Sequence, residues 1–161
     1  MSMSKHAIIT GGSSGIGKAL ASQLAKRSYR LSLISRDQGK LEQAMLDIKK
    51  IHPDAEIQAF SADVGVKSAN FEAIEKAITS FGSPDILTLS AGMAMPGYFS
   101  SLDLSIFEET MQTNYMGTVY SVKAALPAMI KAQRGSIVLV SSGAGLTGVF
   151  GYTAYGASKF A

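Results

Sequence analysis

The sequence predicts an α/β protein, a doubly wound parallel sheet with helices on both faces. Short apolar runs alternate with helix-period patterns along the whole 161-residue chain. Repeated β-α units of this kind imply a parallel sheet with right-handed crossovers. The first unit joins its strand to its helix through a glycine-rich turn at residues 10–17. We expect residues 1–161 to form one domain with three layers, helix, sheet and helix.

Composition excludes several classes of protein. The formal net charge is +3 without a dense run of Lys or Arg, so nucleic-acid binding is not indicated. No stretch approaches the ~18 apolar residues of a membrane span. Residues 1–6 are too few and too polar for a signal peptide, so we expect a cytoplasmic protein. The absence of Cys excludes disulfides and thiolate metal sites.

Five extended segments supply the predicted sheet. Each is short and carries apolar residues, and the fourth is nearly all apolar in its middle, as suits a strand buried on both faces. The strands are expected at residues 7–9, 30–35, 56–61, 85–90 and 136–141.

Helical periodicity separates the strands. Apolar residues recur at helical spacing over residues 16–24, 41–51 and 71–81, and Pro53 and Pro84 help to end the last two of these helices. Ser105 and Glu108 have the spacing of a capping box, which predicts the start of a long helix that continues to residue 133. A further helix begins near Tyr155.

The glycine-rich turn is the first candidate binding element. It has the strand-turn-helix order of a dinucleotide-binding turn in a Rossmann-like fold. Gly11 allows a sharp turn, Gly15 leaves room for a pyrophosphate at the helix amino-terminus, and Gly17 lets the helix pack closely on its strand. The cofactor-binding residues predicted here are Gly11, Ser13, Ser14, Gly15, Ile16 and Gly17.

The end of the second strand indicates which cofactor binds. An acid there hydrogen-bonds the ribose 2′-hydroxyl of NAD, whereas Arg accommodates the 2′-phosphate of NADP. This sequence has Ser35 followed by Arg36, with Asp37 one position later. Because a guanidinium suits phosphate geometry, we predict NADP(H).

Tyr155 and Lys159 are candidate catalytic residues. Four positions apart, they lie on one face of the last predicted helix, and a nearby ammonium favours the ionised form of a phenol. Tyr155 is therefore usable as an acid or a base. Ser142, at the end of the fifth strand, is placed to hydrogen-bond a substrate carbonyl and the Tyr155 hydroxyl.

Together these motifs resemble the short-chain dehydrogenase/reductase family. The residues that carry the resemblance run through the chain and are Thr10, Gly11, Gly15, Ile16, Gly17, Asp63, Val64, Ala91, Gly92, Asn114, Ser142, Tyr155 and Lys159. The resemblance implies that Asp63 and Val64 hold the adenine and that Ala91 and Gly92 belong to the cofactor site.

The resemblance also implies the catalytic roles. Asn114 would support a water linked to Lys159, and Ser142 would orient the ketone. Tyr155 would donate the proton during reduction, with Lys159 binding the nicotinamide ribose beside it. The resemblance thus also places Tyr155, as well as Lys159, among the cofactor-binding residues.

Within the family, four segments are most similar to the 3-ketodihydrosphingosine reductases: residues 90–97, 114–120, 140–155 and 159–161. This similarity implies an NADPH-dependent reductase that converts 3-ketosphinganine to sphinganine in sphingolipid biosynthesis. The alternatives are a reductase of 3-oxoacyl or other carbonyl substrates and a non-catalytic dinucleotide-binding fragment. No membrane span is visible, and peripheral contact with a membrane is left open.

Two departures from the family pattern matter. The usual Asn-Asn-Ala-Gly is Leu89-Ser90-Ala91-Gly92 here, so we expect a local change in packing between the central strands. Family members also continue well past the catalytic helix, whereas this chain stops at Ala161. We expect the 161-residue fragment alone to be inactive, with an open sheet edge, and the full-length protein to be an active homo-oligomer.

The two His and a group of apolar residues are the remaining candidates for a binding role. The two His lack ligand partners at metal spacing, so no metal site is predicted and His6 and His52 are expected at the surface. A set of apolar residues after the fourth strand forms either one wall of a lipid pocket or ordinary packing, and consists of Met93, Met95, Pro96, Tyr98 and Phe99.

Overall fold

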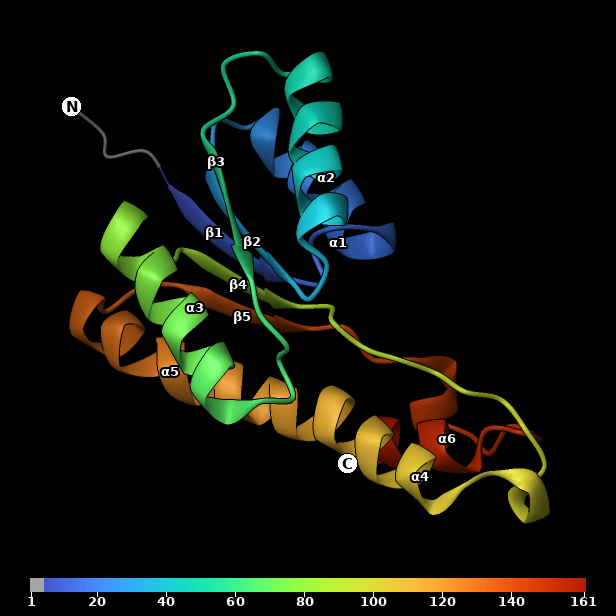
Figure 1. The fold of residues 1–161 in the computed structure, drawn as a ribbon. Helices are drawn as coiled ribbons and strands as arrows, with labels where there is room; N and C mark the ends of the chain where they lie inside the picture. Colours follow the sequence, from blue (N-terminus) through green and yellow to red (C-terminus); the bar gives the residue numbers. More distant parts are fainter. Residues whose placement is uncertain (1–4) are drawn as a thin grey trace.

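Five parallel strands form a single sheet in the computed structural model, which describes residues 5–161 (Figure 1). The strand order is β3-β2-β1-β4-β5, so β1 pairs with β2 on one side and with β4 on the other. The predicted doubly wound sheet is confirmed. The strand bounds are β1 His6–Thr10, β2 Arg30–Ser35, β3 Ile57–Ser61, β4 Ile86–Leu89 and β5 Ser136–Leu139.

Helices cover both faces of the sheet (Figure 1). They bury β1, which carries apolar side chains on each of its two faces. Ala7 and Ile9 pack with residues of α1 and α2, whereas Ile8 packs with residues of α3 and α5. This alternation is the two-residue period of a strand. The helix bounds are α1 Gly15–Ala25, α2 Gln38–Ile51, α3 Lys67–Phe81, α4 Leu104–Met111, α5 Gly117–Ala132 and α6 Thr153–Phe160.

β5 is an edge strand, and its residues Val138 and Leu139 are exposed. Across residues 5–161, the helices are too short or too polar for any of them to span a lipid bilayer.

The long helix predicted to start at a capping box is divided and begins earlier. α4 begins at Leu104, directly after Asp103, so Ser105 lies inside the first turn and the predicted capping box is wrong. A carboxylate at Asp103 is favourable beside a helix amino-terminus. A π-helical segment, η2 (Gln112–Met116), then separates α4 from α5. Such segments insert an extra residue into a helical turn and are frequent at functional sites.

His6 is buried, so its predicted position at the surface is wrong. Its Nδ1 lies 2.8 Å from the carbonyl oxygen of Gly82, and its Nε2 lies 2.9 Å from the Ser32 hydroxyl. Because a carbonyl only accepts, Nδ1 carries the proton and Nε2 accepts from Ser32. The Phe81 ring packs edge-on against the imidazole, with 5.4 Å between ring centroids. Both ring nitrogens are therefore satisfied by the neutral form.

The surroundings of His6 make the fold sensitive to acid. Burial lowers the pKa of His6 from 6.5 to about 4, with a further lowering by the charge of Arg30. The unfolded chain therefore binds a proton at a higher pH than the folded chain does. We predict that the free energy of unfolding falls by about 3 kcal/mol as the pH drops from 6.5 to about 4.

Urea unfolding at several pH values tests this prediction with His6→Asn, which removes the titrating group. The variant should be less stable at neutral pH but should lose less stability than the wild type across this interval. His52→Asn is the matched control and should keep the wild-type pH dependence. An identical pH dependence in His6→Asn and wild type would contradict the prediction.

Candidate active site

The turn between β1 and α1 brings three glycines to the carboxyl end of the sheet. Gly11 has a φ of +70° and donates its N–H to the Ile34 carbonyl at 2.8 Å, so the chain leaves β1 sharply. A Cβ at Gly11 would lie 2.7 Å from the backbone nitrogen of Ala91, and one at Gly17 would overlap the Gly11 carbonyl oxygen. Open space surrounds Gly15. The sharp turn, the open space and the close packing predicted for these glycines are all present.

This turn forms one wall of a cavity of about 340 Å³. The loops after β2, β3 and β4 contribute the other walls. All of the cofactor-binding residues predicted outside α6 lie on this cavity, which is lined by Gly11, Ser13, Ser14, Gly15, Ile16, Gly17, Ser35, Arg36, Asp37, Lys40, Ala62, Asp63, Val64, Ser90, Ala91, Gly92 and Thr113.

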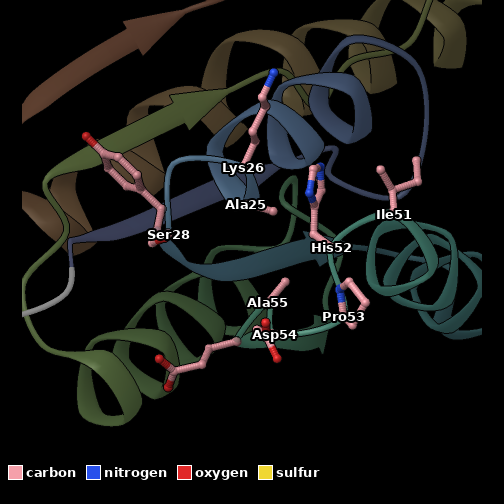
Figure 2. A pocket seen from close by; sticks show the side chains of 10 residues that line it. Ala25, Lys26, Ser28, Ile51, His52, Pro53, Asp54 and Ala55 are labelled. Atoms are coloured by element: carbon pink, nitrogen blue, oxygen red, sulfur yellow. The ribbon is translucent and has the colours of Figure 1, made fainter.

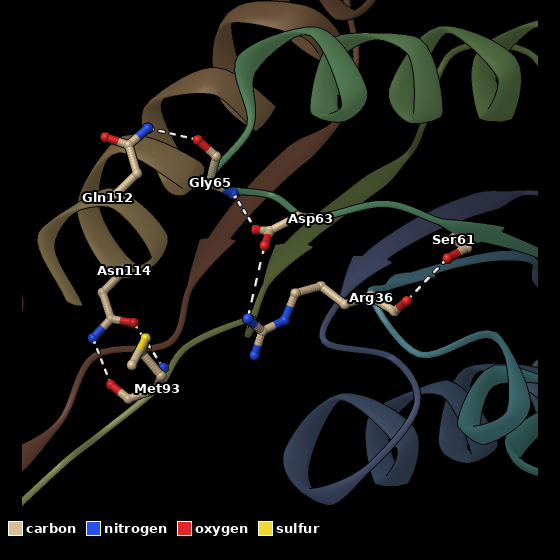
Figure 3. Close-up of polar contacts among 7 residues, drawn as sticks. All are labelled: Arg36, Ser61, Asp63, Gly65, Met93, Gln112 and Asn114. Carbon is tan, nitrogen blue, oxygen red and sulfur yellow. Dashed lines mark hydrogen bonds and ion pairs between the residues drawn. The ribbon is translucent and has the colours of Figure 1, made fainter. Parts of the chain in front are cut away.

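Arg36 and Asp63 approach each other at the cavity wall (Figure 3). Their Nη1 and Oδ2 atoms are 3.7 Å apart and both side chains are substantially exposed, which makes this a weak ion pair. The Asp63 carboxylate also accepts the Gly65 N–H at 2.8 Å, and the Arg36 carbonyl accepts the Ser61 hydroxyl at 3.0 Å. The backbone around Arg36 is thus fixed while its guanidinium is held loosely.

Lys40 is a second cation on the cavity, and sequence reasoning missed it. Its ammonium lies 3.7 Å from the carboxylate of Asp37, which caps α2 through the Lys40 N–H. Its position four residues after Arg36, in the first turn of α2, is the signal that could have found it. A neighbouring hollow of about 360 Å³ shares Arg36, Asp63 and Thr113 with the cavity, so the space around the guanidinium continues toward α4.

Asn114, in the π segment, ties the loop after β4 to α6. Its Oδ1 accepts the Met93 N–H at 2.8 Å, and its Nδ2 donates to the Met93 carbonyl at 2.9 Å (Figure 3). Nδ2 also donates to the Ser158 hydroxyl at 2.9 Å, and that hydroxyl donates to the Tyr155 carbonyl at 2.8 Å. Sequence reasoning missed Ser158. The water link from Asn114 to Lys159 stays a prediction.

Lys159 lies between the cavity and Tyr155. Its ammonium donates to the Val140 carbonyl at 2.9 Å and is 5.8 Å from the centroid of the Tyr155 ring. A Cβ at Gly92, which lines the cavity, would lie 3.8 Å from that ammonium and 3.2 Å from the Oδ1 of Asn114. The structure therefore brings the end of the cavity and the Tyr155–Lys159 pair together at Gly92.

Ser142 lies beyond β5 rather than at its end, because the strand stops at Leu139. Its Oγ accepts the Ala144 N–H at 3.2 Å and caps η3 (Gly143–Gly145), a short 3₁₀ turn that packs on α6. A hydroxyl that accepts in this way keeps its proton for another partner. Ser142 is half-buried next to α6 and can donate to a bound oxygen.

A hollow of about 340 Å³ lies at the opposite end of the sheet (Figure 2). It is formed by the ends of α1 and α2 and the segments that precede β2 and β3. His52, which was expected at the surface, is half-buried in its wall. Open α/β sheets bind ligands outside the carboxyl ends of their strands. We therefore place the candidate active site at the carboxyl ends, where the glycine turn and α6 meet.

Known sequences resemble this chain over nearly its whole length. The family model for the short chain dehydrogenase matches residues 5–161. The 3-ketodihydrosphingosine reductases of Bos taurus and Mus musculus are 41% and 42% identical over 159 residues, which cover 97% of this chain. The enzyme of that name from Dictyostelium discoideum is 40% identical. The chain spans about half the length of these curated relatives, 48% to 52%.

Solved structures share the fold over nearly the whole chain. The F189W variant of actinorhodin polyketide ketoreductase, determined with NADPH, has a TM-score of 0.92 and 26% identity, and the match covers 98% of this chain and 60% of that one. Levodione reductase gives the same TM-score at 25% identity, covering 97% and 61%.

Proposed function

The chain belongs to the short-chain dehydrogenase family, and we propose that it acts in the reduction of a ketone to an alcohol with NADPH. When bound, the nicotinamide supplies a hydride to the carbonyl carbon. The chain supplies orientation and a proton for the carbonyl oxygen. The observation that carries this proposal is the junction at Gly92, where the cavity adjoins Lys159 and, through it, Tyr155.

The cavity fits the phosphates of a dinucleotide. Gly15 leaves open space at the amino-terminus of α1, where N–H groups and the helix dipole stabilise a pyrophosphate. Ser14 makes no side-chain capping bond there, so the N–H groups of the first turn are left for a ligand. Arg36 and Lys40 add two cations to the wall.

Tyr155 acts as the proton donor in this proposal. Its hydroxyl proton passes to the carbonyl oxygen as the carbonyl carbon accepts the hydride, which yields the alcohol and leaves a phenolate. The Lys159 ammonium, anchored on the Val140 carbonyl, stabilises that phenolate. The Ser142 hydroxyl donates to the same carbonyl oxygen and so orients the ketone.

We assign the 2′-phosphate of NADPH to Arg36 and Lys40. The end of β2 carries Ser35 in place of the acid that would favour NAD. Asp63 holds Arg36 only across 3.7 Å at an exposed position, so a phosphate competes well for the guanidinium. The solved actinorhodin ketoreductase structure contains NADPH, in agreement with this choice.

We propose 3-ketosphinganine as the substrate and sphinganine as the product. The support is the identity of 41% and 42%, over 159 residues, to reductases named for this ketone. The similarity to a polyketide ketoreductase keeps a 3-oxoacyl substrate as the second candidate. Rates on a sphingoid ketone and on an acyl-carrier thioester, measured side by side, separate the two.

Replacing Tyr155 with Phe removes the proton donor and keeps the ring. We predict that kcat falls by about 10²-fold or more because the proton donor is lost, while the Kd for NADPH changes little because the phosphate contacts and Lys159 are kept. NADPH oxidation and NADPH fluorescence titration in the complete gene product measure the two quantities.

Tyr152→Phe, the same change three residues earlier, should retain activity. Undiminished turnover in Tyr155→Phe would refute the role. NADPH binding without any turnover in the wild type would favour the non-catalytic alternative.

Replacing Arg36 with Gln removes the cation assigned to the 2′-phosphate. We predict that the Kd for NADPH rises by about tenfold to a hundredfold, whereas the Kd for NADH is unchanged, because only NADPH carries that phosphate. Calorimetric titration of both cofactors measures the difference. Arg27→Gln is the control, since Arg27 is an exposed Arg outside the cavity. An equal loss of affinity for both cofactors would contradict the assignment.

A further inference from the structure

Two long segments near the candidate active site carry no charge. Residues 86–102 and 135–158 contain no Asp, Glu, Lys, Arg or His. The first includes β4 and the loop after it, and the second includes β5 and the loop that leads to α6. Both loops leave the sheet at its carboxyl end and run alongside each other toward α4 and α6 (Figure 1).

The two loops are joined to each other at their tips. The Gly97 N–H donates to the Gly151 carbonyl at 2.9 Å. Beside this bond the rings of Tyr98 and Phe150 meet edge to face, with centroids 5.7 Å apart. We call this pair of rings, together with the backbone bond, the aromatic clasp. It has a defined geometry although it is formed by loops.

The aromatic clasp is exposed although its rings are large. Phe150 is 85% and Tyr98 is 68% accessible to solvent. Leu146 and Phe99, in the same two uncharged segments, are 84% and 70% accessible. Single exposed apolar side chains are ordinary, but the rings of Tyr98 and Phe150 are in contact, and exposed apolar side chains that adjoin one another mark a binding surface.

A second pair of aromatic rings lies close to the clasp in the sequence and includes Tyr155. The Tyr152 and Tyr155 rings meet edge to face at 5.6 Å, and Tyr152 follows Phe150 by two residues. Because residues 135–158 carry no charge, a ligand with its carbonyl at Tyr155 and its other end at the clasp would meet only uncharged side chains of this segment. A ligand that fills this surface is apolar along its length and polar only at the end that reacts.

We propose that the aromatic clasp seats the alkyl chain of a long-chain ketone and so sets the chain-length preference of the reductase. The inference rests on the proposed function, which it deepens by naming the part of the substrate that binds here. The absence of basic residues from both segments favours an alkyl chain over a membrane surface, because anionic lipid headgroups recruit Lys and Arg.

A homologous series of ketones tests the proposal. The series shares the head group of 3-ketosphinganine and varies the chain from hexyl to dodecyl, each used below its micelle concentration. In the wild-type gene product, kcat/KM should rise by up to about fourfold for each methylene that reaches the clasp. The double variant Tyr98→Ser/Phe150→Ser should lower kcat/KM for the dodecyl ketone by about tenfold or more and leave that for the hexyl ketone unchanged.

A matched control and a fold check accompany the double variant. Leu46→Ser/Ile51→Ser removes two exposed apolar residues from α2 and should keep the wild-type chain-length dependence. An unchanged Kd for NADPH in the clasp variant shows that the cofactor cavity is intact. Equal losses on short and long ketones, or no loss, would overturn the clasp's role alone.

Two further outcomes separate the clasp from its alternatives. A wild-type protein that reduces no ketone of the series overturns the proposed function and the clasp's role with it. Sedimentation with phosphatidylcholine vesicles measures whether the protein binds to a membrane surface. Loss of vesicle binding in the clasp variant, with its chain-length dependence unchanged, would overturn the proposal in favour of a membrane contact.

Discussion

The close approach of the α1 turn to the ends of β1 and β4 is the constraint on which the rest of the site depends. Gly17 lies against the Gly11 carbonyl and the Ser90 hydroxyl, and Gly11 lies against the backbone of Ala91, with no room for a Cβ at either glycine. Ser90 donates to the Thr10 carbonyl at 2.6 Å, so it joins the ends of β1 and β4.

A second connection links this arrangement to α6. Asn114 satisfies both backbone groups of Met93 and reaches Ser158 in α6 from a π-helical turn, whose extra residue shifts the register between α4 and α5. A Cβ at Gly117, just after that turn, would meet the Val64 side chain at 2.9 Å, so α5 packs tightly on the loop after β3. The cavity and the Tyr155 helix are thus held in one rigid frame.

The sequence was sufficient for features that depend on neighbouring residues. Strand and helix periodicity predicted the layers, and the glycine spacing predicted the turn, because both follow from local backbone geometry. Features that depend on distant partners were not predictable in this way. The two ring contacts of His6 come from residues 26 and 76 positions away, and Ser158 acquires its role from Asn114, 44 positions earlier. The place of Lys40 on the cavity wall likewise depends on how α2 packs, although its spacing from Arg36 is visible in the sequence.

The central claim is that the carboxyl end of the sheet joins a dinucleotide cavity to a proton donor for ketone reduction. Transfer of deuterium from the cofactor tests this claim most directly. The complete gene product is incubated with 3-ketosphinganine and with NADPH that carries deuterium at both C4 positions of the nicotinamide, and the product is analysed by mass spectrometry. The account predicts a single deuterium on the carbinol carbon, because the proton from Tyr155 goes to the oxygen. Binding of the labelled cofactor without formation of deuterated alcohol would contradict it.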